Sequence, residues 1–149
     1  MKSRDVRKFQ EKAAKLLQKA QIAITSEEKK GMEVADFGLN DVENIGLELV
    51  IYVNNDRYCA KELVLLPRQI APEHRHPRVD EKNLGKRETF RCRFGDVYLY
   101  TEGIPTSSPR ATVPAKYKKY FTVWNEIVLL AGQQYTLEPD TLHWFQAGD

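Results

Sequence analysis

The sequence predicts a mainly β protein, a sandwich or barrel of short strands with one amphipathic helix packed on its outside. Three observations support this prediction. Apolar residues near the N-terminus recur at three- and four-residue steps, as in a helix with one buried face. From about residue 48 onward, short strand-like runs follow one another at close intervals, and turn-forming residues separate them. Many short strands with such turns are typical of antiparallel sandwiches and barrels.

The helical N-terminal segment covers about residues 3–32. Its first part, residues 3–20, carries an apolar stripe on a surface otherwise rich in Lys and Glu: Val6, Phe9, Ala13, Leu16, Leu17 and Ala20. A short helical turn is expected after Thr25 or Ser26, ending at Gly31. A solvated basic face explains the charges of the first helix better than a membrane surface or a nucleic acid does.

The strand region covers about residues 34–149. It holds eight expected strands: Glu48–Val53, Ala60–Leu66, Glu73–His76, Thr89–Arg93, Asp96–Tyr100, Thr122–Leu130, Gln134–Leu137 and His143–Gln146. Residues 104–120 show no clear period and are expected to form a long crossover. The basic and aromatic residues of this crossover leave phosphate or nucleic-acid binding as a weaker alternative.

Composition limits the class of protein. The 149 residues fit a single domain, and 42% hydrophobic residues are enough for a core. A net charge of +2 indicates neither a nucleic-acid partner nor an acidic one. Cys59 and Cys92 are interpreted as reduced core residues. No signal-like apolar segment and no membrane-length run occurs, so we expect a cytoplasmic protein with no membrane partner.

The histidines are the main chemical feature. His74 and His76 are two residues apart, so in an extended strand both face the same side and can meet one ion. The third and last histidine, His143, stands in another strand-like run. With the carboxylate of Glu88 they form a nitrogen and oxygen set that suits manganese, iron, nickel or zinc. The alternative is a surface histidine pair and a separate core histidine.

The spacing of these residues resembles the two cupin motifs. His74, His76, Glu88 and Gly95 resemble the first motif, although the gap from His76 to Glu88 is longer than usual. Gly132 and His143, eleven positions later, resemble the second. Here Asp140 stands where a turn glycine is usual.

A closer resemblance covers most of the chain. It is carried by five runs: Val34-Ala35-Asp36-Phe37-Gly38-Leu39, Pro72-Glu73-His74-Arg75-His76-Pro77, Glu88-Thr89-Phe90-Arg91-Cys92-Arg93, Val97-Tyr98-Leu99-Tyr100 and Thr141-Leu142-His143-Trp144-Phe145-Gln146-Ala147-Gly148. In these runs the chain resembles the D-lyxose isomerase family of bacterial cupins. The resemblance implies a cupin jelly-roll barrel, a homodimer, and a divalent metal held by the four ligands named above. Mn²⁺ is the first choice, with Fe²⁺, Co²⁺, Ni²⁺ or Zn²⁺ as alternatives.

The implied function is a ketol-isomerase of free sugars, converting D-lyxose to D-xylulose and D-mannose to D-fructose. Such a reaction moves a proton between C1 and C2 through an enediol, with a metal polarising both sugar oxygens. The same ligands leave two alternatives open: an iron-dependent cupin dioxygenase and a non-catalytic sugar-binding cupin. No glycine-rich loop precedes a helix, which favours a free sugar over a phosphosugar.

The isomerase also needs a base that moves the carbon-bound proton. Lys61 and Glu126 are the candidates, because each interrupts an apolar strand in phase with apolar neighbours that should face inward. Outward surface positions are the alternative for both. Glu73 would point away from the metal unless a bulge reverses it. The family generally continues beyond the position of Asp149, so we expect this chain to be truncated there or to obtain the missing edge otherwise.

Overall fold

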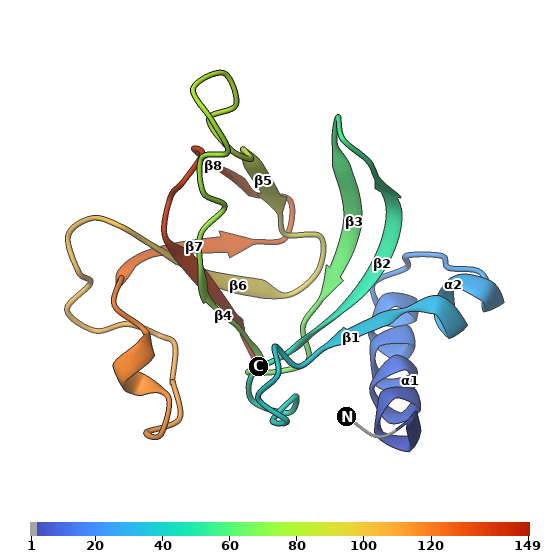
Figure 1. The fold of residues 1–149 in the computed structure, drawn as a ribbon. Helices are drawn as coiled ribbons and strands as arrows, with labels where there is room; N and C mark the ends of the chain where they lie inside the picture. Colours follow the sequence, from blue (N-terminus) through green and yellow to red (C-terminus); the bar gives the residue numbers. More distant parts are fainter. Residues whose placement is uncertain (1–2) are drawn as a thin grey trace. The chain divides into compact units, whose positions relative to one another are not determined.

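The computed structural model describes residues 3–149, with the side chains of residues 5–149. The chain divides into two compact units, Met1–Gln69 and Ile70–Asp149. The mainly β prediction is confirmed, since strands outnumber helices along the described chain and make up most of the regular structure of the second unit (Figure 1). The single domain predicted from the sequence stays a prediction.

The first unit combines two helices with a three-stranded antiparallel sheet (Figure 1). Its elements are α1 (Ser3–Lys19), α2 (Ser26–Gly31), β1 (Glu33–Ala35), β2 (Leu47–Asn54) and β3 (Cys59–Val64). The Thr25 hydroxyl caps α2 by accepting from the Glu28 amide at 3.1 Å, and the Glu28 carboxylate accepts from the Thr25 amide at 2.6 Å. This reciprocal pair explains why so short a helix begins at Ser26.

The amphipathic helix predicted from the apolar stripe is confirmed. Ala13 and Leu17 of α1 are buried with Met32, Val50 and Val64 in one apolar cluster. Burying a Leu or Val side chain stabilises a fold by about 1.5–3 kcal/mol, so this packing fixes α1 on one face of the sheet. No helix in the described part of the chain is both long and apolar enough to cross a membrane.

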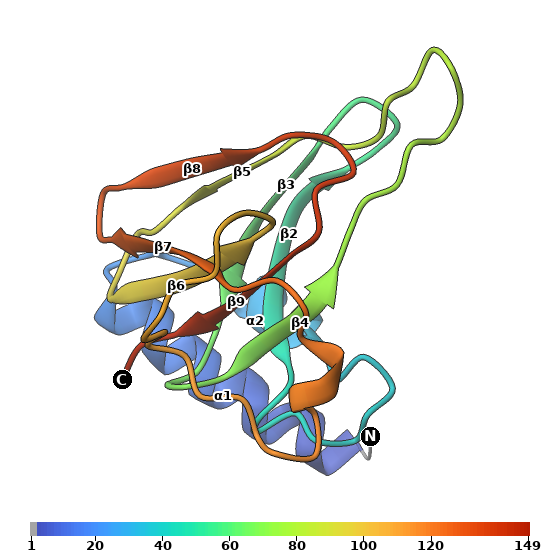
Figure 2. The ribbon, with the colours of Figure 1, turned by 90° about the vertical axis from the view of Figure 1, so that its left-hand side faces the viewer.

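The second unit contains a four-stranded antiparallel sheet in the order β4-β9-β6-β7 and a separate two-stranded pair, β5-β8 (Figure 2). The strands are β4 (Ile70–His74), β5 (Glu88–Arg91), β6 (Asp96–Thr101), β7 (Asn125–Leu130), β8 (Gln134–Leu137) and β9 (His143–Ala147). Phe90 of β5 packs on Phe145 of β9, with ring centroids 5.2 Å apart. The pair therefore lies against the sheet face that carries Phe145.

Each expected strand is present: Gln134–Leu137 has the expected bounds, and the others have at least one shifted end. β4 ends at His74 instead of reaching His76, and β7 begins at Asn125 instead of Thr122. The sequence did not indicate β1, which is only three residues long. In the crossover, the 3₁₀ turn η1 (Lys118–Tyr120) is the regular element that forms. Among the described residues the strand pairings make three separate sheets and do not close a cylinder.

One buried acid in the first unit lacks a full set of partners. Glu48 is completely buried on the α1 side of β2, where its Oε1 accepts from Gln69 Nε2 at 3.2 Å. Its Oε2 has no hydrogen-bond partner. Burial, opposed weakly by Gln69 and by Lys12, raises the pKa of Glu48 to about 7.

We expect Glu48→Gln to stabilise the protein above neutral pH. The folded state keeps a proton on Glu48 that the unfolded chain loses above pH 4.5, so this contribution is complete below pH 4.5 and is lost as pH rises through about 7. The neutral amide avoids that loss, which is worth about 3 kcal/mol. Urea unfolding of both proteins at about pH 4 and about pH 8 measures it. If the free energy of unfolding changed by the same amount between the two pH values in the parent and in Glu48→Gln, the raised pKa of Glu48 would be contradicted.

Candidate metal centre

The four predicted ligands meet at one point in the second unit. The ligand atoms of His74, His76, Glu88 and His143 all lie within 4.8 Å of one another. The imidazole centroids of His74 and His143 are 4.3 Å apart, and those of His74 and His76 are 5.1 Å apart. Residues up to 69 positions apart in sequence, from His74 to His143, thus form one cluster.

A β-bulge in β4 turns His74 toward this cluster. Ala71 pairs with Phe145, and His74 pairs with His143, so three steps along β4 match two steps along β9. Phe145 and His143 share one sheet face because side chains alternate. Without the extra residue His74 would face the opposite side, and the bulge corrects this. His76 lies just beyond the end of β4.

The other two ligands stand at strand beginnings. His143 is the first residue of β9 and is buried opposite Thr101 of β6. Glu88 is the first residue of β5, opposite Leu137 of β8. Strand ends hold the backbone rigidly and still leave one side of the side chain free for a ligand.

Backbone carbonyl groups fix the tautomers of two imidazoles. His74 Nδ1 lies 2.8 Å from the Pro72 oxygen, and His143 Nδ1 lies 2.8 Å from the Thr141 oxygen. A carbonyl oxygen only accepts, so each Nδ1 carries the hydrogen and donates it. The Nε2 atom of each ring in its neutral form is then a lone-pair donor, as metal ligation requires.

The inner atoms of the cluster lack hydrogen-bond partners. Glu88 Oε2 lies 3.0 Å from His76 Nε2 and 3.3 Å from His143 Nε2, within ion-pair distance. The angles are not those of a hydrogen bond, and all three atoms count as buried and unpaired. Buried polar atoms are nearly always paired in native proteins. Three such atoms directed at one point fit a bound cation.

The protonation states also suit a cation. Burial lowers the pKa of His74 and the pKa of His76, although His76 is the less buried of the two. Both imidazoles are therefore neutral at pH 7. Burial raises the pKa of Glu88, but the adjacent His143 imidazole and the Lys86 ammonium outweigh it and hold that pKa at about 2. Three nitrogens and one carboxylate suit a divalent transition metal better than calcium, and leave coordination positions open.

Glu126 does not face this cluster. The register aligns Glu126 with Tyr100 and Trp144, on the sheet face opposite His143. Its carboxylate accepts from the Tyr100 hydroxyl, from the Arg110 amide at 2.7 Å and from the Arg110 guanidinium at 2.8 Å. The charge of Glu126 thus serves a network that holds the crossover, on the sheet face opposite the ligands. Its predicted role in proton transfer stays a prediction.

Lys61 lies on β3 in the first unit. It pairs with Ile51, on the face of the sheet opposite the one that packs on α1, and it is half-buried. This agrees with the predicted phase of Lys61 relative to Leu63. Its role in proton transfer stays a prediction.

One residue of the cluster was not anticipated. Lys86 Nζ lies 2.5 Å from Glu88 Oε1. Its position in the sequence could have indicated this contact. Lys86 stands two residues before the ligand Glu88, and alternate residues of an extended chain share a side.

A mainly β chain that brings three histidines and one glutamate together, with His143 buried and the other three half-buried, has the features of a cupin with a candidate metal site. The L-ribose isomerase of Acinetobacter sp. DL28, solved in complex with L-ribose, matches 99% of this chain and 76% of its own with a TM-score of 0.76 and 15% identity. The L-ribose isomerase of Cellulomonas parahominis matches 99% and 78% with a TM-score of 0.74 and 16% identity. At such identity the likeness shows the fold alone.

Sequence comparison identifies the family. The D-lyxose ketol-isomerase of Thermofilum sp. (strain ex4484_79) is 62% identical over 97% of this chain and 79% of its own length. The D-lyxose/D-mannose isomerase of Thermosediminibacter oceani is 60% identical over 100% and 82%, and the D-lyxose ketol-isomerase of Cohnella laeviribosi is 51% identical over 99% and 81%. No family model matches the chain. The chain belongs to the D-lyxose isomerase family, as the sequence motifs indicated.

Proposed function

We propose that this protein is a metal-dependent ketol-isomerase that converts D-lyxose to D-xylulose and D-mannose to D-fructose. The observation that carries the metal part is the convergence of four ligand atoms within 4.8 Å, with inner atoms that have no other partner. The identity of 51–62% to sugar isomerases supports the reaction and the substrates.

His74, His76, Glu88 and His143 would hold the metal, with Mn²⁺ as the first choice. When bound there, a divalent cation supplies Lewis acidity for two sugar oxygens. The neutral imidazoles leave most of the cationic charge available, and the two Nδ1 hydrogen bonds keep the His74 and His143 rings in place.

The chain's own residues must then move a proton. In the forward direction the C2 proton leaves and returns at C1, while the O2 hydroxyl proton passes to O1, so the aldose becomes a ketose with no net loss of atoms. We propose Lys61 as a proton carrier or a hydrogen-bond donor to the sugar, because it is half-buried on an otherwise apolar strand face. Glu126 is bonded within its own network and is the weaker candidate.

The reaction class can be tested with the intact protein. Incubation with Mn²⁺ and a panel of aldoses, scored for ketose and for oxygen uptake, should give ketose from D-lyxose and D-mannose without oxygen uptake. Oxygen uptake would instead indicate a dioxygenase. Saturable sugar binding without turnover would indicate a sugar-binding cupin.

Replacing any ligand with Ala should remove both metal and turnover. His74→Ala and His143→Ala each delete one nitrogen of the cluster, and the loss of a ligand from a four-ligand site weakens binding severely. Elemental analysis after dialysis, together with ketose formation, measures both effects. Full metal occupancy in both variants would place the site elsewhere.

Lys61→Met should lower kcat and leave the metal content intact. For a proton carrier we expect a loss on the order of 10²-fold or more in kcat, together with the loss of solvent-deuterium incorporation at C1 or C2. Glu126→Gln is the matched comparison, because it removes the charge of the other candidate residue and keeps the shape of its side chain. Glu126 lies on the sheet face opposite the ligands. Parental exchange and turnover in Lys61→Met would rule this residue out, and a loss in Glu126→Gln alone would move the role to Glu126.

We also propose a homodimer. The sheets of the described residues leave edge strands, β4 and β7 among them, and such edges commonly pair across a two-fold axis. Light scattering over a wide concentration range should give twice the monomer mass. A monomer mass throughout that range would refute the proposal.

A further inference from the structure

We propose that Lys86 is a positioning residue that holds one oxygen of the Glu88 carboxylate away from the metal, and thereby reserves a coordination position for the sugar. The inference rests on the proposed function and deepens it. It concerns how many ligand atoms the protein itself supplies at the site.

The two oxygens of Glu88 have different neighbours. Oε2 faces the imidazoles, 3.0 Å from His76 Nε2 and 3.3 Å from His143 Nε2, and has no hydrogen-bond partner. Oε1 accepts from Lys86 Nζ at 2.5 Å. One oxygen is thus presented to the cluster and the other is held by an ammonium group. A carboxylate held in this way offers a single ligand atom.

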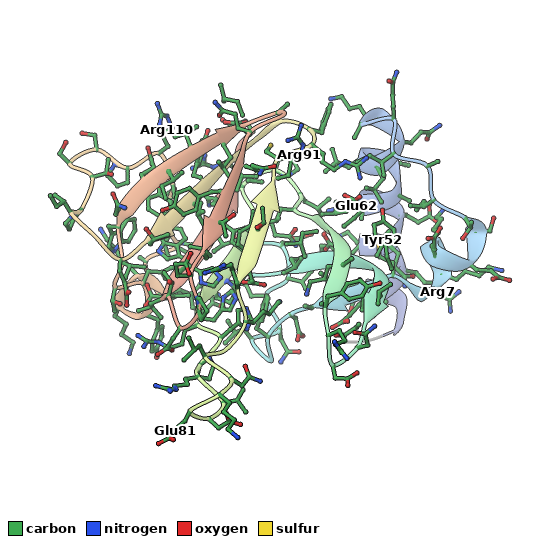
Figure 3. The ribbon with its side chains drawn as sticks, turned by 90° about the horizontal axis from the view of Figure 1, so that it is seen from above. Arg7, Tyr52, Glu62, Glu81, Arg91 and Arg110 are labelled. Atoms are coloured by element: carbon green, nitrogen blue, oxygen red, sulfur yellow. The ribbon has the colours of Figure 1, made fainter. Side chains whose placement is uncertain are left out.

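The loop before β5 delivers Lys86 to this position by its own structure. Gly85 has a φ of +98°, and a Cβ there would lie 2.8 Å from the carbonyl oxygens of His76 and Pro77. The chain can therefore return beside the ligand His76 only because residue 85 is glycine. Asp80 Oδ1 accepts from the amides of Lys82 and Asn83, at 2.7 and 2.8 Å, and closes the turn. Figure 3 shows Glu81 at the outer end of this loop, away from the strands.

The effect of Lys86 lies in geometry more than in stability. Its side chain is 36% exposed, so water weakens the ion pair as a source of folding energy. A charge-assisted hydrogen bond nevertheless fixes the direction of the carboxylate. To bind through both oxygens, Glu88 would have to break this bond. With this bond intact, the protein supplies four ligand atoms instead of five. A sugar that chelates the metal through two oxygens needs the coordination position that the fifth atom would fill.

The test compares three variants of the full chain. Lys86→Met removes the ammonium and keeps the length of the side chain. Lys86→Arg keeps a cationic donor. Lys82→Met is the matched control, because Lys82 is exposed in the same loop and only its backbone amide takes part in the turn.

The readouts are the visible spectrum of the Co²⁺-loaded proteins, their Co²⁺ dissociation constants, and D-lyxose binding followed by the same spectrum. In Lys86→Met we expect Co²⁺ to bind within a few-fold of the parental constant and the absorption bands to change, because a second carboxylate oxygen would occupy a coordination position that is otherwise open. The dissociation constant of D-lyxose should rise on the order of 10-fold. Lys86→Arg and Lys82→Met should behave like the parent.

A parental spectrum and parental sugar affinity in Lys86→Met would overturn the inference. So would the loss of Co²⁺ from that variant, since Lys86 would then hold the cluster together instead of limiting its ligands. These results leave the proposed function standing as long as the parent binds Co²⁺ and forms ketose. A parent that binds no Co²⁺ would overturn the proposed function and this inference together.

Discussion

The candidate site depends on one irregularity, the bulge between Ala71 and His74. It places His74 on the same sheet face as His143, although a regular strand would have turned it away. Pro72 lies within the bulge, one of the places in a sheet where proline is found. Its carbonyl oxygen accepts from His74 Nδ1. Glu73 then points elsewhere and accepts from the amides of Thr122 and Val123 at 2.6 and 3.0 Å. One extra residue thus aims a ligand and anchors the end of the crossover.

The sheet of the second unit has two faces with different tasks. One carries His143 and Phe145, next to the cluster. The other carries Trp144 stacked on Tyr100, with ring centroids 4.0 Å apart, and the Glu126 carboxylate bonded to Tyr100 and Arg110. The Tyr100 hydroxyl in turn accepts from the Ala111 amide at 2.9 Å. Buried polar groups are expensive unless they are satisfied, and here they are satisfied by fixing the crossover.

These two features show what the sequence could and could not reveal. Local periodicity was enough for α1 and for the strands, and the His74-x-His76 spacing was enough to nominate the ligands, because both depend on neighbours in sequence. The sequence did not reveal which sheet face carries Glu126. A charged residue in an apolar strand is equally consistent with a reactive site and with a structural network of hydrogen bonds and ion pairs. Deciding between them requires the register of β7 against β6 and β9, which depends on pairing between distant segments. The bulge in β4 and the contact of Lys86 also depend on tertiary structure.

The charge of the cluster connects its geometry to its chemistry. An imidazole that binds a metal through its lone pair is neutral, so the three histidines would add no net charge to the site. The single carboxylate, Glu88, is matched by the Lys86 ammonium at 2.5 Å. The protein thus neutralises little of a divalent cation's charge, whereas a site built from several carboxylates would neutralise most of it. A cation with more residual charge stabilises a developing oxyanion more strongly in a buried site. Enediol formation places negative charge on sugar oxygens. A nitrogen-rich site whose carboxylate is already paired is therefore suited to aldose–ketose chemistry, at the expense of some metal affinity.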